Sequence, residues 1–90
     1  MNTTYSVRTT PDFDKQIKKL DSFISKKILM WLYKNIENTE DPRTKGKGLS
    51  KSNRGLWRYR IGDYRVICSI EDDQLIVLAL EVGHRSKVYD

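Results

Sequence analysis

The strongest constraint on the fold is a stretch of alternating residues interrupted by Gly62-Asp63. Two runs rich in β-branched and aromatic residues flank this dipeptide, residues 56–61 (LWRYRI) and residues 64–70 (YRVICSI). Gly followed by Asp between two such runs is typical of a two-residue hairpin turn. The sequence therefore predicts a tight antiparallel hairpin with this dipeptide at its tip.

The two faces of this hairpin differ in chemistry. Period-two alternation around the turn places Arg58, Arg60 and Arg65 on one face. The other face is suited to packing under helices and carries Trp57, Tyr59, Ile61, Tyr64, Val66, Cys68 and Ile70. Like charges directly opposite each other on a sheet are destabilising, by roughly 0.2–1 kcal/mol for a pair. A bound anion would offset that repulsion, and a merely solvated sheet face is the alternative.

Two helices are predicted ahead of the hairpin. Residues 5–9 indicate a short first strand, after which Thr10 can cap a helix that Pro11 opens. That helix would bury Phe13, Ile17 and Leu20, which are spaced i, i+4 and i+7. Asp21-Ser22 supplies a second capping signal, after which a wider apolar stripe predicts a second helix from about Ser22 to Asn38. It would bury Ile24, Ile28, Trp31, Leu32 and Ile36.

The remaining segments complete an α+β fold. Residues 38–54 lose the hydrophobic period and indicate a long basic loop. A turn at residues 71–74 leads into residues 75–82, which are apolar at both alternating positions and so predict a strand buried on both faces. We expect an N-terminal strand, a two-helix hairpin and a three-stranded antiparallel meander, forming one sheet packed on the helices. Residues 1–90 should make a single domain.

Positive charge is concentrated around the loop and the hairpin. The chain has 17 Lys and Arg against 12 Asp and Glu, a net charge of +5 that favours polyanionic partners such as nucleic acid. Between residues 43 and 70 there is one acid, Asp63, and the cations are Arg43, Lys45, Lys47, Lys51, Arg54, Arg58, Arg60 and Arg65.

Several classes of site are excluded or disfavoured. One cysteine, Cys68, allows no internal disulfide, and one histidine, His84, leaves no zinc motif. The acids at residues 71–73 fit a solvated turn, so no metal and no cofactor is assigned. No signal peptide or membrane span is evident, which favours the cytoplasm and argues against a membrane partner.

The C-terminal segment, residues 83–89 (GHRSKVY), gathers an imidazole, two cations and a phenol. Such groups suit phosphate binding, proton transfer and base stacking. A solvated polar tail is the alternative.

Residues 55–67 (GLWRYRIGDYRVI), followed by residues 82–85 (VGHR) and 88–89 (VY), resemble the RelE branch of the RelE/ParE toxin superfamily. The helical hairpin and the basic loop agree with it in length and order. The resemblance implies a metal-independent endoribonuclease that cuts mRNA on the ribosome, by attack of the 2′-hydroxyl on the adjacent phosphate. It also implies a RelB-like antitoxin that holds the toxin in a hetero-oligomeric complex.

The resemblance assigns roles to individual residues. Arg65 matches the arginine that stabilises the phosphate, Arg85 the arginine at the leaving group, and Tyr89 the tyrosine that stacks on the nucleotide. Arg60 stands where related toxins carry a lysine, as does Arg58. Arginine, with a pKa above roughly 12, is a poor proton acceptor. We therefore expect Arg60 to stabilise charge, and His84, of a residue type with an unperturbed pKa near 6.5, to be the substitute base.

The remaining cations are expected to bind RNA: Lys45, Lys47, Lys51, Arg54, Arg58 and Lys87. Two other functions stay open at this point. One is a ParE-like inhibitor of DNA gyrase without nuclease activity, against which the retained Arg65, Arg85 and Tyr89 argue. The other is a non-enzymatic nucleic-acid-binding domain, which would hold phosphates with the same arginines but cut nothing.

Overall fold

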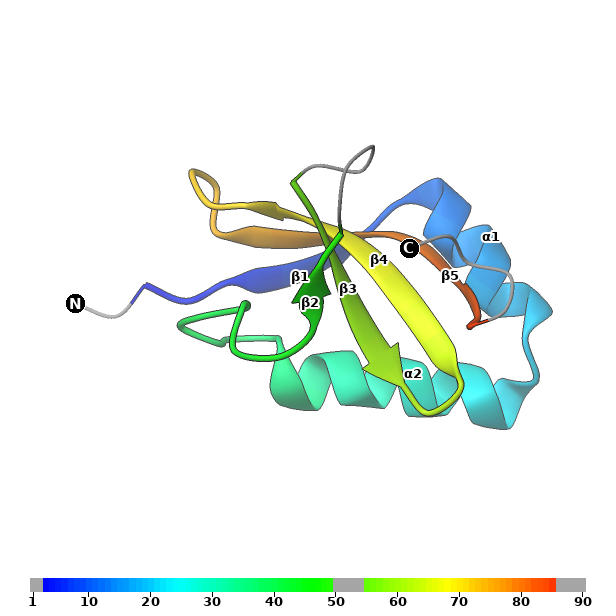
Figure 1. Ribbon diagram of the computed structural model, residues 1–90. Coiled ribbons are helices and arrows are strands. Elements are labelled where there is room, and N and C mark those ends of the chain that lie inside the picture. The colour runs from blue at the N-terminus through cyan, green and yellow to red at the C-terminus, as the bar shows by residue number, and fades with distance from the viewer. Residues whose placement is uncertain (1–2, 50–54, 86–90) are drawn as a thin grey trace.

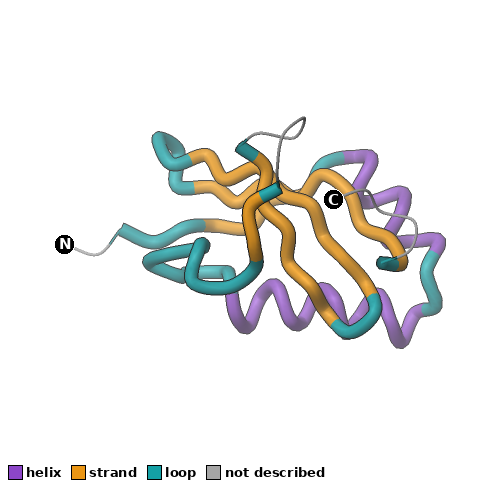
Figure 2. Tube along the Cα trace, viewed as in Figure 1, coloured by secondary structure: helices purple, strands orange, loops and turns teal. Residues whose placement is uncertain are grey.

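The computed structural model describes residues 3–49 and 55–85, which form a sheet with two helices against one of its faces (Figure 1). The elements in chain order are β1 (Ser6–Thr9), α1 (Pro11–Lys19), α2 (Ser22–Asn35), β2 (Lys47–Gly48), β3 (Leu56–Ile61), β4 (Tyr64–Glu71) and β5 (Ile76–His84). Figure 2 shows the α2–β2 loop and the β4–β5 turn at the same end of the sheet. Among the described residues, no helix is both long and apolar enough to span a membrane.

The sheet is mixed and has the strand order β1-β5-β4-β3-β2. β1 runs parallel to β5, and the other neighbours are antiparallel. The predicted α+β class is confirmed, but the predicted strand count was wrong. The sheet has five strands because Lys47 and Gly48, expected in an unpaired loop, pair with Arg58 and Trp57 of β3.

The predicted hairpin of β3 and β4 has the expected register, with Ile61 opposite Tyr64. Gly62 takes φ +61°, the positive value required at the first turn position of a type II′ hairpin. The local sequence signal therefore determines which residues share each face of this hairpin.

Both helices begin at the capping residues that the sequence indicates. The Thr10 side chain accepts a hydrogen bond from the Phe13 N–H at 3.2 Å, and Asp21 accepts one from the Phe23 N–H at 3.0 Å. These contacts satisfy N–H groups that would otherwise lack partners in the first helical turn.

The second helix ends at Asn35, earlier than the predicted Asn38, because the chain turns back to β1. Asn38 adopts φ +67°, and its N–H donates to the Tyr5 carbonyl at 2.8 Å. The Glu37 carboxylate accepts from the Val7 N–H at 2.7 Å. Residues 37–39 thereby cover the free edge of β1, which protects it from pairing with another strand.

The core lies between the helices and one face of the sheet. Its most deeply buried members are Phe13, Ile28, Leu32, Ile36, Tyr59, Val66, Cys68, Val77 and Ala79. The rings of Trp31 and Tyr59 lie with centroids 5.6 Å apart, which joins α2 to the centre of the sheet.

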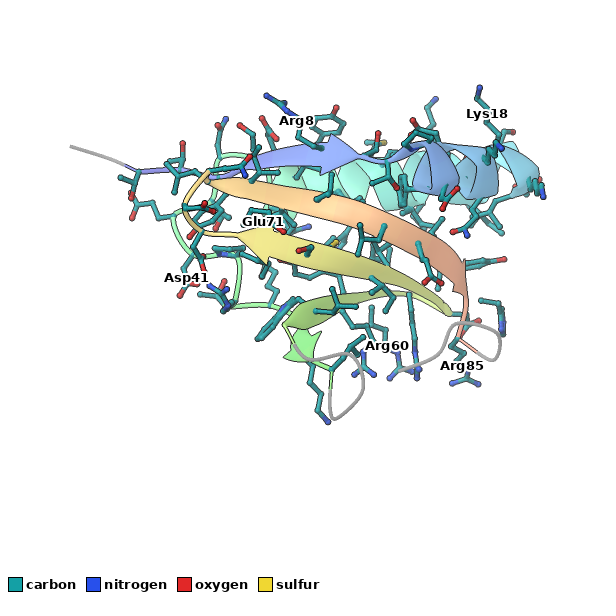
Figure 3. All side chains as sticks on the ribbon, turned by 90° about the horizontal axis from the view of Figure 1, so that it is seen from above. Arg8, Lys18, Asp41, Arg60, Glu71 and Arg85 are labelled. Atoms are coloured by element: carbon teal, nitrogen blue, oxygen red, sulfur yellow. The ribbon has the colours of Figure 1, made fainter. Side chains whose placement is uncertain are left out.

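The prediction that residues 75–82 are buried on both faces was wrong. Val77, Ala79 and Val82 are buried on the helix side, whereas Leu78 and Leu80 are half-buried. In the described part of the chain, both helices lie on one side of the sheet, so the other side of β5 has no layer to cover it (Figure 3).

Candidate functional site

Two arginines meet on the sheet face that points away from the helices. Arg60 lies opposite Arg65 across β3 and β4, and Arg65 lies opposite Gly83 of β5. Their sequence neighbours Tyr59 and Val66 are buried under the helices, so alternation turns the arginines to the open side. Side chains directly opposite on antiparallel strands have Cβ atoms about 5 Å apart.

Arg85 joins this group through the backbone. Its N–H donates to the Asp63 carbonyl at 2.8 Å, which fastens the end of β5 to the β3–β4 turn. Figure 3 shows Arg60 and Arg85 projecting from the side of the sheet opposite to the helices. We call Arg58, Arg60, Arg65 and Arg85 the arginine surface.

Arg58 extends this surface along β3 and is partly desolvated. It lies opposite Ile67, which is only 3% exposed although it is on the open face. The aliphatic stem of an arginine can cover such a side chain while its charged end stays in water. Burial lowers the pKa of Arg58, and the positive charges of Arg65 and Arg60 lower it further. Repulsion of this kind is relieved when an anion binds between the cations.

The α2–β2 loop brings further cations to the same edge of the sheet. Lys47 is the Cα partner of Arg58, so the two side chains share a face. The Lys45 carbonyl accepts a hydrogen bond from Trp57 Nε1 at 2.7 Å, and the Pro42 carbonyl accepts one from the buried Tyr59 hydroxyl at 2.7 Å. The predicted RNA-binding lysines 45 and 47 are therefore held beside β3, and both are exposed.

A polar network ties this loop to the neighbouring β4–β5 turn. Arg43 donates two hydrogen bonds to the Asp72 carboxylate, at 3.0 and 2.9 Å, and the Tyr5 hydroxyl donates to the same carboxylate at 2.6 Å. The Arg43 guanidinium, and then the Tyr5 hydroxyl, hold the pKa of Asp72 below its usual range. The sequence does not predict this role, because nothing local in it relates three residues so far apart.

The structure does not bring His84 together with the arginines on one face. His84 is the Cα partner of Tyr64, and their rings meet edge to face with centroids 5.5 Å apart. Tyr64 lines the hollow between the β3–β4 turn and α2, so this pair is on the helix side of the sheet. Gly83, not His84, faces Arg65.

Two strand carboxylates lie on the arginine-bearing face, Glu71 at the end of β4 and Glu81 on β5, and Glu81 is the one beside the arginines. Glu81 is opposite Ile67, in the row next to that of Arg60 and Arg65, and its side chain is exposed. Glu81 was not among the predicted site residues, because both faces of β5 were expected to be buried. The other predicted site residues, Lys51, Arg54, Lys87 and Tyr89, lie outside the described residues.

Comparison with known proteins identifies the family. The model of the ParE toxin of type II toxin–antitoxin systems (parDE) matches residues 7–89. The sequence is 28% identical over 85 residues to toxin RelG of Mycobacterium tuberculosis, covering 94% of this chain and 95% of RelG.

Solved structures agree with that match. A chain in the crystal structure of a RelBE toxin–antitoxin complex from M. tuberculosis is similar, with a TM-score of 0.83 and 28% identity, covering 91% of this chain and 99% of that one. A chain of the archaeal RelE–RelB complex from Pyrococcus horikoshii has a TM-score of 0.70 and 26% identity, covering 94% and 99%. The resemblance seen in the sequence is confirmed, and the chain belongs to the RelE/ParE superfamily of toxins of type II toxin–antitoxin systems.

Proposed function

We propose that this toxin is a ribosome-dependent endoribonuclease that cuts mRNA in the cytoplasm without a metal ion. In this reaction the 2′-oxygen forms a bond to the adjacent phosphorus, the bond from phosphorus to the 5′-oxygen breaks, and a 2′,3′-cyclic phosphate remains. The 2′-hydroxyl loses a proton and the departing 5′-oxygen gains one. Arg65 would stabilise the negative charge on the phosphate, and Arg85 the charge developing on the 5′-oxygen.

The observation that carries this proposal is the arginine surface itself. Arg60, Arg65 and Arg85 are grouped where strand pairing and the Arg85–Asp63 hydrogen bond bring them together on an open face. Such grouping weakens the fold unless it serves an anion, and the transition state of phosphate cleavage carries more negative charge than the substrate. We propose that Arg58, Lys45 and Lys47 bind the flanking phosphates, as do Lys51, Arg54 and Lys87, while Tyr89 stacks on a base.

His84 is proposed to act as a positioning residue rather than as the base. Its ring contacts Tyr64 on the helix side and precedes Arg85, so it can fix the end of β5 that presents Arg85. Glu81 is the better-placed proton acceptor within the described chain, because it shares the face of Arg65 and lies in the next row, whereas Glu71 is on that face at the other end of β4. Matched variants distinguish the role of His84 from that of Glu81. Glu81→Gln should slow single-turnover cleavage by about 10²-fold or more, a typical general-base contribution, whereas His84→Gln should alter the rate only a few-fold and leave its pH profile unchanged.

The direct test of the function is to map mRNA 5′ ends on stalled ribosomes after the toxin is induced. We expect new ends inside codons in the ribosomal A site, and none with Arg65→Ala. Arg8→Ala is the matched control, since Arg8 is an exposed arginine at the other edge of the sheet (Figure 3). Intact mRNA with the folded wild-type toxin on programmed ribosomes would refute the proposal.

A ParE-like inhibitor of DNA gyrase is the alternative within the superfamily. The name of the matching family model favours it, whereas RelG and the RelE–RelB complexes favour the RelE branch. A gyrase supercoiling assay with purified toxin distinguishes the two. A non-enzymatic domain would bind RNA in a salt-dependent way without producing new ends.

We further propose that a RelB-like antitoxin neutralises the toxin in a hetero-oligomer. Two of the solved structures similar to this chain are a RelBE complex and a RelE–RelB complex. Acidic or amphipathic antitoxin segments would complement the arginine surface and block RNA from it. Purified antitoxin should then compete with single-stranded RNA for the toxin.

A further inference from the structure

The side of α2 that faces away from the sheet carries apolar side chains that the fold leaves uncovered. Phe23, Met30 and Tyr33 are 75%, 62% and 63% exposed. Ile28 and Leu32, on the opposite side of the same helix, are each 1% exposed and pack in the core. The core needs only that inner stripe, so the outer apolar residues need another explanation.

Lysines surround these outer residues. Lys26 and Lys27 lie between Phe23 and Met30 on the helix surface, and Lys34 lies one turn beyond Met30. All three are exposed, and residues 22–36 contain no acid. We call this set the α2 outer face: Phe23, Lys26, Lys27, Met30, Tyr33 and Lys34.

Three hollows adjoin Phe23. One, of about 250 Å³, lies between α2 and the β3–β4 turn and is lined by Ile24, Lys27, Ile61 and Tyr64, among others. A second, of about 260 Å³, is lined by Phe23, Lys26, Lys27 and Met30. A third, of about 500 Å³, is lined by Ser22, Phe23, Ser25, Lys26 and Leu29. Three side chains of roughly 200 Å² each, about two-thirds exposed, present on the order of 400 Å² of surface, within the range of functional patches on monomers.

We propose that the α2 outer face binds one acidic amphipathic helix of a partner protein. Apolar side chains of that helix would enter the hollows beside Phe23 and cover Met30, and its carboxylates would pair with the lysines. A second copy of α2 fits poorly, because lysines would meet lysines across the interface. The shaped hollows favour side chains over phosphates, which would match the lysines but leave Phe23 and Met30 uncovered. The inference goes beyond mRNA cleavage, since this face is on the opposite layer from the arginine surface.

The test uses ¹⁵N-labelled toxin and a synthetic 18-residue helical probe with leucines at i, i+3, i+4 and i+7 and glutamates at its other exposed positions. We expect shift changes at the amides of residues 22–34. A control probe with lysine in place of each glutamate should bind at least tenfold more weakly. The Phe23→Ser/Met30→Ser double variant should weaken binding of the acidic probe at least tenfold.

Two further variants keep the test decisive. Arg60→Ala should leave the affinity for the acidic probe within twofold of wild type. If the arginine surface bound the probe, this variant would bind it more weakly. The Lys26→Glu/Lys27→Glu variant retains the apolar residues, so it can replace the serine double variant if that variant does not fold. It should bind the lysine-containing control probe more tightly than the acidic probe. The rate of mRNA cleavage by either double variant should stay within twofold of wild type. Failure of the nuclease proposal can therefore be distinguished from failure of the helix-binding proposal.

Several results would overturn this inference. Shift changes confined to the arginine surface, or equal affinity for both probes, would remove the acidic partner. Loss of binding to phosphatidylglycerol vesicles or to single-stranded RNA in the Phe23→Ser/Met30→Ser variant would assign the face to a membrane or to RNA. A concentration-dependent dimer that Met30→Glu abolishes would assign it to self-association.

Discussion

Gly46 is the position where the α2–β2 loop comes closest to the sheet, and Gly46→Ala tests how the loop is held. Gly46 has φ +83°, and an added Cβ would lie 2.4 Å from the Arg58 carbonyl oxygen and 2.6 Å from Trp57 Nε1. Both distances are far inside van der Waals contact, and the first involves the backbone of β3. The substitution therefore requires either the loop or the strand to move.

The loss of stability depends on whether the site stays in place or the loop moves. An alanine at positive φ costs roughly 1–2 kcal/mol, and overpacking a filled site adds typically 1–3 kcal/mol. If the loop moves away, the overpacking is relieved, but the Trp57–Lys45 hydrogen bond is broken, a net contribution of about 0.5–1.5 kcal/mol, together with the short β2 pairing. Displacement of the loop therefore costs less than overpacking the site. We expect a loss of about 2–3 kcal/mol in the free energy of unfolding, with the loop displaced.

Gly55→Ala is the matched control, because Gly55 also has positive φ, +87°, but an added Cβ meets no atom of the described residues within 4 Å. It should lose only the conformational part, roughly 1–2 kcal/mol. Urea unfolding measures both variants. The displaced loop should also carry lysines 45 and 47 away from Arg58, lowering the salt slope of single-stranded RNA binding by about 0.7 for each phosphate that the toxin no longer binds. Equal stability losses in the two variants, with an unchanged slope for Gly46→Ala, would refute the close approach.

Three further predictions concern single side chains. Arg65→Ala should fold normally but cleave mRNA about 10²-fold or more slowly, which single-turnover kinetics and circular dichroism together can check. The Cys68 thiol, whose pKa burial raises to about 12, should resist iodoacetamide at pH 8 until the protein is unfolded in urea; labelling at the native rate of a free thiol would contradict its burial. Because the pKa of Asp72 is lowered in the fold, its contribution to stability is present above the unfolded value near 4 and lost as pH falls through the folded value. Arg43→Lys should therefore reduce the acid sensitivity of urea unfolding between pH 5 and about 2, and an unchanged profile would exclude that contribution.

The parts of the fold that the sequence predicted well depend on short-range signals. The Gly62-Asp63 turn and the alternation around it determine that Arg60 lies opposite Arg65. Capping by Thr10 and Asp21 is likewise local, since each side chain binds an N–H two or three residues away. These features need no information about the rest of the chain, so a single sequence suffices to predict them.

The parts that it could not predict depend on distant residues. The second helix ends early because Asn38 and Glu37 bind β1, and the loop is ordered because Arg43 meets an aspartate 29 residues later. Asp72 was expected to be a solvated turn residue, and its contacts with Arg43, and with Tyr5 67 residues away, give it a structural role. Such pairs carry no periodicity and no motif.

The position of His84 shows how the alternation of side chains along a strand determines the chemistry of a β-sheet site. In the sequence, His84 and Arg85 are neighbours and look equally available to the phosphate. In the sheet, β5 continues through His84, so alternation sends the imidazole to the side of Tyr64 and leaves Gly83 beneath Arg65. Arg85 escapes this alternation because it follows the strand and turns back to Asp63. Within the described chain, the face that would hold the scissile phosphate therefore presents arginines and Lys47, with Glu81 as the carboxylate beside them, a composition that stabilises charge far better than it moves protons. A catalyst of this kind depends on its substrate being held with the 2′-hydroxyl already in line, which is what a requirement for the ribosome would supply.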